Sequence, residues 1–118
     1  MKFDVKEFID EKYAKAINIL KENLKENYHI FYGVRLSEIL FPASEYGTDA
    51  FYQEFEAINS VVLPLVVYDL NEKKPIMVIG FELKNGKTML ESSDVTVLEI
   101  ESLSDILTND VLSVLFVE

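Results

Sequence analysis

The 118 residues suffice for one domain with a hydrophobic core, and an apolar fraction of 49% excludes a disordered chain. A formal net charge of −10 argues against direct binding to nucleic acid, because each phosphate contact requires Lys or Arg. No apolar run reaches the roughly 18 residues that cross a bilayer. Cysteine is absent, which excludes a disulfide framework and fits a reducing cytoplasm. We therefore expect a single cytoplasmic domain over residues 1–118 that does not contact a membrane.

The first predicted element is a long amphipathic helix from Asp4 to about Glu26. Asp4 is a suitable N-cap, Glu7 has the spacing of a capping box, and Phe3 and Phe8 occupy the positions of a hydrophobic staple. Apolar residues then recur every three or four positions, as expected for one buried face: Val5, Phe8, Ile9, Tyr13, Ala16, Ile17, Leu20 and Leu24.

A strand and a shorter helix are predicted next. Residues 28–36 alternate in the manner of a strand, and Ser37 is positioned to begin a short turn that Pro42 ends. After a loop, Thr48 is an N-cap candidate for a second helix that ends near Asn59.

The centre of the chain is predicted to be a β-hairpin of residues 61–68 and 75–81, joined by the polar loop 69–74. Both runs are nearly all apolar, which indicates strands buried on both faces. Pro64 cannot donate a ladder hydrogen bond, so it implies an edge position, a bulge or a strand start.

A second hairpin is predicted at Asn85–Gly86, with Thr88–Leu90 returning antiparallel, and residues 95–100 form a further strand. Residues 102–118 combine helical spacing with a strand-like end, so their type stays open. The expected fold is α+β, with a long N-terminal helix and a shorter helix packed on a mostly antiparallel sheet of about five strands.

Acidic residues dominate the last quarter of the sequence. From Thr88 onward there are seven acids and no Lys or Arg. This block is either a solvated surface that promotes solubility or an acidic face that docks on a basic protein. The candidate partner-binding acids are Glu91, Asp94, Glu99, Glu101, Asp105 and Asp110.

Aromatic residues crowd a window of fewer than thirty positions: Tyr28, Phe31, Tyr32, Phe41, Tyr46, Phe51, Tyr52 and Phe55. Most of them are expected in the core. The window nevertheless holds more rings than one core face easily accommodates, so the loop 41–48 is expected to present Phe41 or Tyr46 to a partner. Aromatic groups beside acids suit a basic protein better than nucleic acid.

Few residues are available for catalysis. The single histidine, His29, lies at a strand start, where a surface or packing role is the usual one. The four glycines are scattered and form no phosphate-binding loop, so no nucleotide cofactor is expected. Carboxylates that bind Mg²⁺ are the one enzymatic route that the composition leaves open.

The order of elements from Tyr28 to Glu82 carries a resemblance. A strand at 34–40 is followed by a short aromatic helix at 51–59, a strand at 65–69 and an apolar strand at 78–82. In order and spacing this resembles a small bacterial branch of the restriction-endonuclease-like superfamily, the PD-(D/E)XK nucleases. The resemblance implies an N-terminal helix followed by a nuclease-like fold, in which two carboxylates of the family coordinate a metal ion.

The departures from the family pattern fall on its functional positions. The first metal-binding aspartate of the family corresponds to Pro64, and the strand glutamate corresponds to Gly80, so only Glu82 keeps a carboxylate. Lys84 completes a Glu-x-Lys pair that is expected to be a surface strand end. The later helix of the family is expected to be replaced by the Asn85–Gly86 hairpin. The resemblance therefore implies a non-catalytic descendant without metal ligands.

The favoured function is a small, acidic, non-enzymatic module that binds a protein with a basic surface. Its target could be a nucleic-acid-processing or bacterial defence enzyme that it inhibits by mimicking phosphates. One alternative is a divergent metal-dependent nuclease that uses Glu82. Another is a structural homodimer paired through the edge at Thr88–Leu90.

Overall fold

The computed structural model describes residues 1–118 and has an α+β architecture with five α-helices and one mixed sheet. The sheet order is β1-β2-β3-β4, with antiparallel β1–β2 and β2–β3 pairs and a parallel β3–β4 pair. The predicted class is confirmed, but the sheet has four strands rather than about five. The strands are β1 (Tyr28–Arg35), β2 (Val62–Asp69), β3 (Lys74–Gly80) and β4 (Thr96–Glu99).

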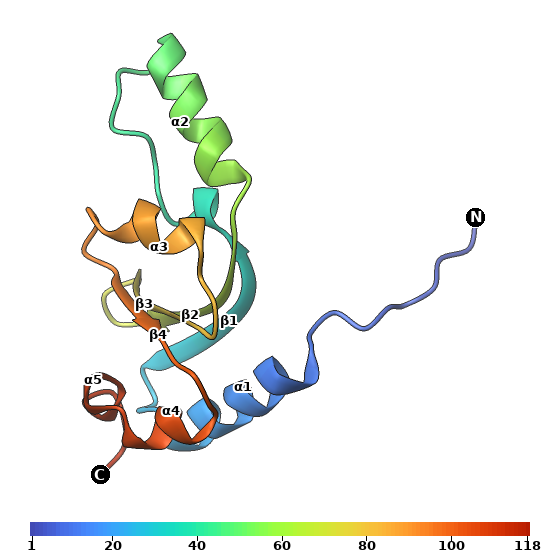
Figure 1. The fold of residues 1–118 in the computed structure, drawn as a ribbon, viewed down its shortest axis with the longest axis vertical. Helices are drawn as coiled ribbons and strands as arrows, with labels where there is room; N and C mark the ends of the chain where they lie inside the picture. The colour runs from blue at the N-terminus through green and yellow to red at the C-terminus, as the bar shows by residue number, and fades with distance from the viewer.

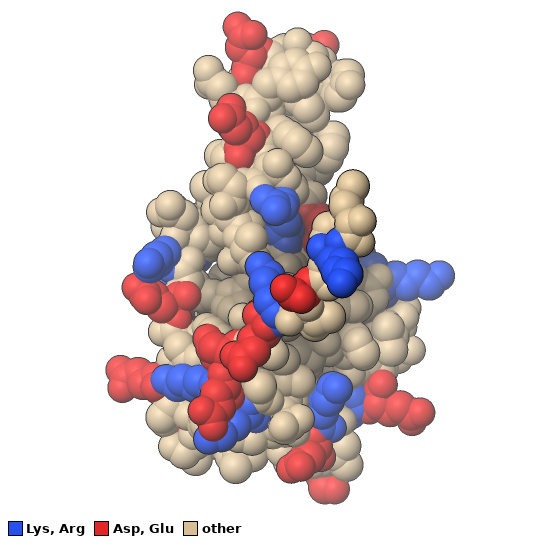
Figure 2. All heavy atoms as spheres, turned by 90° about the vertical axis from the view of Figure 1, so that its right-hand side faces the viewer, with Lys and Arg blue, Asp and Glu red and all other residues tan.

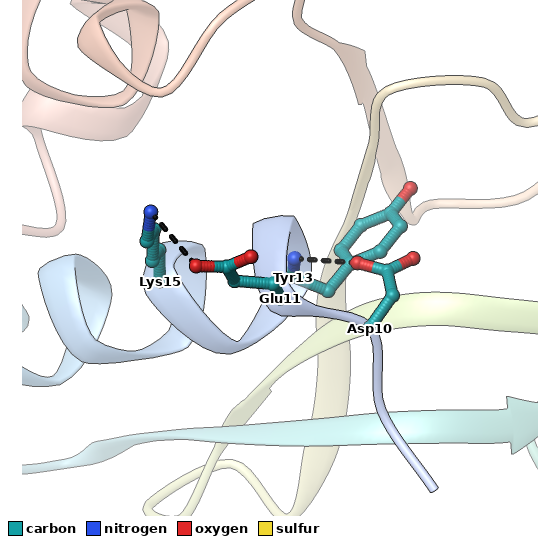
Figure 3. Close-up of polar contacts among 4 residues, drawn as sticks. All are labelled: Asp10, Glu11, Tyr13 and Lys15. Atoms are coloured by element: carbon teal, nitrogen blue, oxygen red, sulfur yellow. Dashed lines mark hydrogen bonds and ion pairs between the residues drawn. The ribbon is translucent and has the colours of Figure 1, made fainter. Parts of the chain in front are cut away.

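The first helix, α1 (Glu11–Asn23), is shorter than predicted at both ends. Its N-cap is Asp10, whose carboxylate accepts a hydrogen bond from the Tyr13 backbone nitrogen at 2.9 Å (Figure 3). A salt bridge of 3.2 Å between Lys15 and Glu11 supports the first turns. The predicted start at Asp4 is wrong, because Asp10 is the residue that begins the helix.

Residues 1–8 have no regular secondary structure and are exposed, so the predicted staple of Phe3 and Phe8 does not form. The ring of Phe8 instead packs edge-on against Tyr32, with centroids 5.3 Å apart. Most helical stability in proteins comes from packing an apolar face. The helix forms only where that face meets the core, which begins at Tyr13 and continues through Ala16 and Leu20.

Both faces of the β2–β3 hairpin are buried, as the sequence predicted. On one face, strand residues pack with α1, α4 (Ser104–Thr108) and α5 (Asp110–Ser113). On the other face they pack with the 3-10 turn η1 (Leu36–Glu38), the end of α2 (Asp49–Asn59) and α3 (Asn85–Leu90). Fully buried strand residues are Leu63, Leu65, Val66, Val67, Val78 and Ile79.

The predicted hairpin at Asn85–Gly86 is wrong, because these residues begin helix α3. A type I′ turn needs positive φ at both central residues. Positive φ occurs instead at Lys84 (46°), where the chain turns into the helix. The buried side chain of Leu90 holds α3 on the sheet, and the chain then returns as β4, parallel to β3. Consequently, Thr88–Leu90 is not a strand edge and cannot pair two copies as proposed above.

The C-terminal residues are mainly helical, which resolves the segment that the sequence left open. Helices α4 and α5 follow β4, and Asn109 caps α5 by accepting hydrogen bonds from Val111 and Leu112 backbone nitrogens. The strand-like end contributes a single isolated bridge between Phe116 and Leu24.

Two parts of the chain project from the packed body (Figure 1). Helix α2 and the loop before it form an arm on one side, and residues 1–8 extend from α1 on another. The radius of gyration of 15.7 Å exceeds the roughly 13.5 Å typical of a compact domain of this length. No helix of the chain has the length and apolarity needed to cross a membrane.

Replacing Asp10 tests the position of the helix start. Asp10→Ala removes the cap of α1 and lowers the free energy of unfolding by about 1 kcal/mol. Asp4→Ala is the matched control and leaves stability unchanged, because Asp4 caps no helix. Urea denaturation of both variants gives the comparison, and a larger loss for Asp4→Ala would contradict this helix boundary.

Candidate functional site

The three positions singled out by the nuclease resemblance come together in space. Pro64 lies in β2 and Gly80 ends β3, and a Cβ atom added to Gly80 would lie 2.9 Å from Pro64 Cγ. The same atom would lie 2.5 Å from Leu83 Cδ2. The Gly80 position therefore has no room for a side chain, because the proline ring and Leu83 fill the space beside it.

Pro64 lies in an interior strand, where the sequence predicted an edge, a bulge or a strand start. It falls opposite Gly33, between the paired residues Leu65–Tyr32 and Leu63–Val34. Gly33 has a φ of 72°, a conformation that favours glycine. On the side facing β3, the pairing ends at Leu65 and Ile79, one residue before Pro64 is reached. Pro64 is therefore unpaired with both β1 and β3, and its lack of an N–H group breaks no ladder hydrogen bond.

Glu82 lines an open cavity of about 520 Å³ together with Pro64, Arg35 and Tyr13. Its carboxylate is exposed and lies 3.9 Å from Lys84 Nζ, a surface pair that contributes little to stability. The Tyr13 hydroxyl oxygen accepts a hydrogen bond from the Phe81 backbone nitrogen at 2.9 Å. Burial raises the pKa of the Tyr13 phenol.

Nowhere in the chain do three His, Asp or Glu side chains gather closely enough to hold a metal ion. His29 lies on β1, exposed, with its ring 4.8 Å from that of Phe31. The cavity beside Glu82 therefore brings together one guanidinium, one carboxylate and the two phenols of Tyr13 and Tyr32. Arg35 is already engaged, because its Nη1 donates to the Asn59 carbonyl oxygen at 2.6 Å.

The predicted acidic block is distributed over several elements and partly occupied by internal bonds. The Glu99 carboxylate forms an ion pair with Lys87 Nζ at 2.9 Å, and the hydrogen bond that Lys87 donates lowers the pKa of Glu99. The pKa of Asp105 is lowered by the backbone N–H groups of Ser102 and Glu101, which it caps. The side chains without such bonds are Glu91, Asp94, Glu101 and Asp110.

The aromatic residues form a second candidate site on the projecting arm, which we define as residues 36–60. Phe51 of α2 is buried at the centre of the aromatic cluster. The rings of Phe41 and Tyr46, from the preceding loop, lie 5.4 and 5.0 Å from it. Tyr52 and Phe55 complete the cluster from the helix. Phe41 and Tyr46 are 73% and 76% exposed, so the outer face of the cluster is open to solvent.

Hydrogen bonds brace the arm at both ends. Thr48 caps α2 through the Phe51 backbone nitrogen, as predicted, and its hydroxyl donates to the Glu45 carbonyl oxygen. The Glu54 carboxylate accepts a hydrogen bond from the Ser44 backbone nitrogen at 3.3 Å. At the base, Arg35 and Ser37 both hold Asn59. The exposed rings are thus carried on a fixed support rather than on a free loop.

The arm carries charge of one sign. It contains five acids and no Lys or Arg: Glu38, Glu45, Asp49, Glu54 and Glu56. Figure 2 shows acidic atoms without basic ones on the upper part of the projection, whereas the body below mixes both signs. The sequence predicted the exposed Phe41 and Tyr46, but the accompanying acids were expected after Thr88 rather than on the arm. The absence of Lys and Arg between Arg35 and Lys73 was the sequence signal for an acidic arm.

Comparisons of this chain with protein families, with curated proteins and with solved structures find no match. The resemblance to PD-(D/E)XK nucleases therefore stays a prediction. Helix α3 follows β3 where a hairpin was expected, but its six residues contain neither His nor Asp.

Substitution of Gly80 tests the close contact with Pro64. Gly80→Ala places a methyl group against the proline ring and Leu83, and lowers the free energy of unfolding by about 1–3 kcal/mol. In a Leu83→Ala background the same substitution costs less, because one of the two clashing groups is gone. Denaturant titration of the four proteins measures this coupling, and an unchanged stability of Gly80→Ala would disprove the contact.

Proposed function

We propose that this chain is a non-catalytic protein-interaction module that uses the arm to bind a protein with a basic surface. The observation that carries the proposal is the exposed aromatic cluster on a braced, purely acidic projection. Aromatic residues are enriched among the side chains that dominate binding energy at protein interfaces. Because the arm is already held in shape, little conformational entropy is lost when it binds.

The charge of the arm supports a basic partner. Its five carboxylates surround rings that can bury apolar area against the partner. Surfaces that contact nucleic acid carry Lys and Arg arranged to neutralise phosphates. We therefore place the partner among nucleic-acid-processing enzymes, such as those of bacterial defence, with the arm occupying the phosphate-binding surface. The absence of cysteine is compatible with the cytoplasm as the compartment.

The structure around Glu82 supports the non-catalytic part of the proposal. A carboxylate at position 80 would collide with Pro64, so a second metal ligand cannot be supplied from the end of β3. Two carboxylates that converge on one Mg²⁺ are the minimum for the nuclease chemistry of the resemblance. Glu82 belongs to no group of three or more possible metal ligands, and its carboxylate lies 3.9 Å from Lys84 Nζ.

The partner is first captured on the immobilised chain and purified. Alanine substitutions in the arm then test the proposal through their effect on the affinity for this partner. Phe41→Ala and Tyr46→Ala each weaken binding by about 30-fold, as expected for aromatic hot spots. Phe31→Ala is the matched control, because Phe31 is a partly exposed ring on β1 outside the arm. Isothermal titration calorimetry gives the affinities.

Salt dependence is the second readout of this experiment. Affinity for the purified partner falls as NaCl rises, because the carboxylates of the arm face basic side chains. Binding that is indifferent to salt would eliminate phosphate mimicry. Binding that depends on Phe31 and not on Phe41 or Tyr46 would eliminate the arm as the interface.

A further inference from the structure

A second uncovered apolar surface lies at the other end of the molecule, between the sheet and α5. It is a groove of about 610 Å³ lined by apolar residues that include Ile76, Val111 and Val114, together with the acidic Asp94 and Asp110. Val111 and Val114 are 48% and 69% exposed. We call this surface the α5 groove. Neither the arm nor the Glu82 cavity contributes to it.

The groove adjoins an open edge of the sheet. Thr96, in β4, also lines it, and β4 is the last strand of the sheet. The outer edge of β4 therefore presents backbone N–H and C=O groups that no other strand pairs. An extended peptide lying in the groove can form backbone hydrogen bonds with this edge while placing alternate side chains against the apolar lining.

Residues 1–6 of the chain have the properties that such a peptide needs. Apolar Met1, Phe3 and Val5 alternate with charged residues, the pattern of a half-buried strand. The segment has no helical or sheet hydrogen bonds in this structure, and Phe3 and Val5 are 85% and 101% exposed. These two largely exposed apolar side chains are available to pack against another molecule.

Charge points to the same pairing. Residues 1–25 hold six basic and five acidic residues, whereas the remaining 93 hold five basic and sixteen acidic residues. When Phe3 and Val5 face the groove, Lys2, Asp4 and Lys6 share the opposite face, and the two long lysine side chains can bend toward Asp94 and Asp110. Figure 1 shows the segment leaving the body on the side away from α5, so the donor is a second chain.

We infer that residues 1–6 of one copy lie as an added strand in the α5 groove of a second copy. Reciprocal exchange of the two segments then gives a closed homodimer. This dimer uses neither the helical residues 88–90 nor the arm, so it goes beyond the proposed binding function.

Light scattering with segment variants tests the dimer. The full chain scatters as a species of twice its 13.6 kDa mass, and Phe3→Ser combined with Val5→Ser weakens association about 100-fold. Thermal unfolding of this variant's monomer is unchanged, because both side chains are exposed. Leu70→Ser, which removes a half-exposed apolar side chain from the β2–β3 loop, leaves the dimer intact. A wild-type monomer, or a dimer indifferent to both segment substitutions, would overturn the inference.

Engineered cysteines locate the segment, because the natural chain has none. A Val5→Cys chain mixed with a Val111→Cys chain forms a disulfide-linked heterodimer under mild oxidation. The Leu70→Cys chain, similarly exposed, cross-links to Val5→Cys at least about tenfold more slowly. Preferential cross-linking to Phe31→Cys instead would place the segment on the open edge of β1 and overturn the α5 groove as its site.

Discussion

The burial of β2 and β3 on both faces is the constraint on which the rest of this structure depends. Each strand carries apolar side chains on both sides, so the sheet needs a layer of helices above and below it. Helices α1, α4 and α5 form one layer, and η1, α3 and the end of α2 form the other. The chain passes between the two layers twice, through β1 and through β4, and these two strands flank the hairpin in the sheet.

The same constraint decides what the end of the hairpin can hold. Where β2 and β3 separate, the Pro64 ring and the Leu83 side chain close on Gly80. Apolar packing occupies the position at which a carboxylate pair would require space and water. The close packing of Pro64 and Leu83 on Gly80 leaves no room for a carboxylate there, and we propose a function by surface contact on that basis.

Apolar residues that the two layers do not use remain at the surface. The sheet covers only the last turn of α2 through Ile58, so the rest of that helix buries Phe51 against its own loop and exposes the surrounding rings. The α5 groove and residues 1–6 are the other uncovered apolar parts. Acidic side chains accompany both the arm and the groove, and residues 1–6 carry Lys2 and Lys6 together with Asp4.

Local patterns predicted the fold wherever burial and periodicity agreed. The β2–β3 hairpin, β1, the Thr48 cap and α2 follow directly from the sequence because packing reinforces each pattern. Asp4 failed as a cap because nothing covers the helical face that it would begin. Asn85–Gly86 failed because turn propensity is weak beside the burial of Leu90. The exposed Phe41 and Tyr46 were predicted, but the acidity of their support could be recognised only when the arm was seen as one unit.

Titration with Mn²⁺ followed by NMR tests most directly whether this molecule acts by contact rather than through a metal ion. Paramagnetic broadening near a bound ion reports which backbone amides surround it. Our account predicts diffuse broadening over the exposed carboxylates and none that saturates around Glu82 and Leu83. Saturable broadening centred on those two residues and abolished by Glu82→Gln would contradict it.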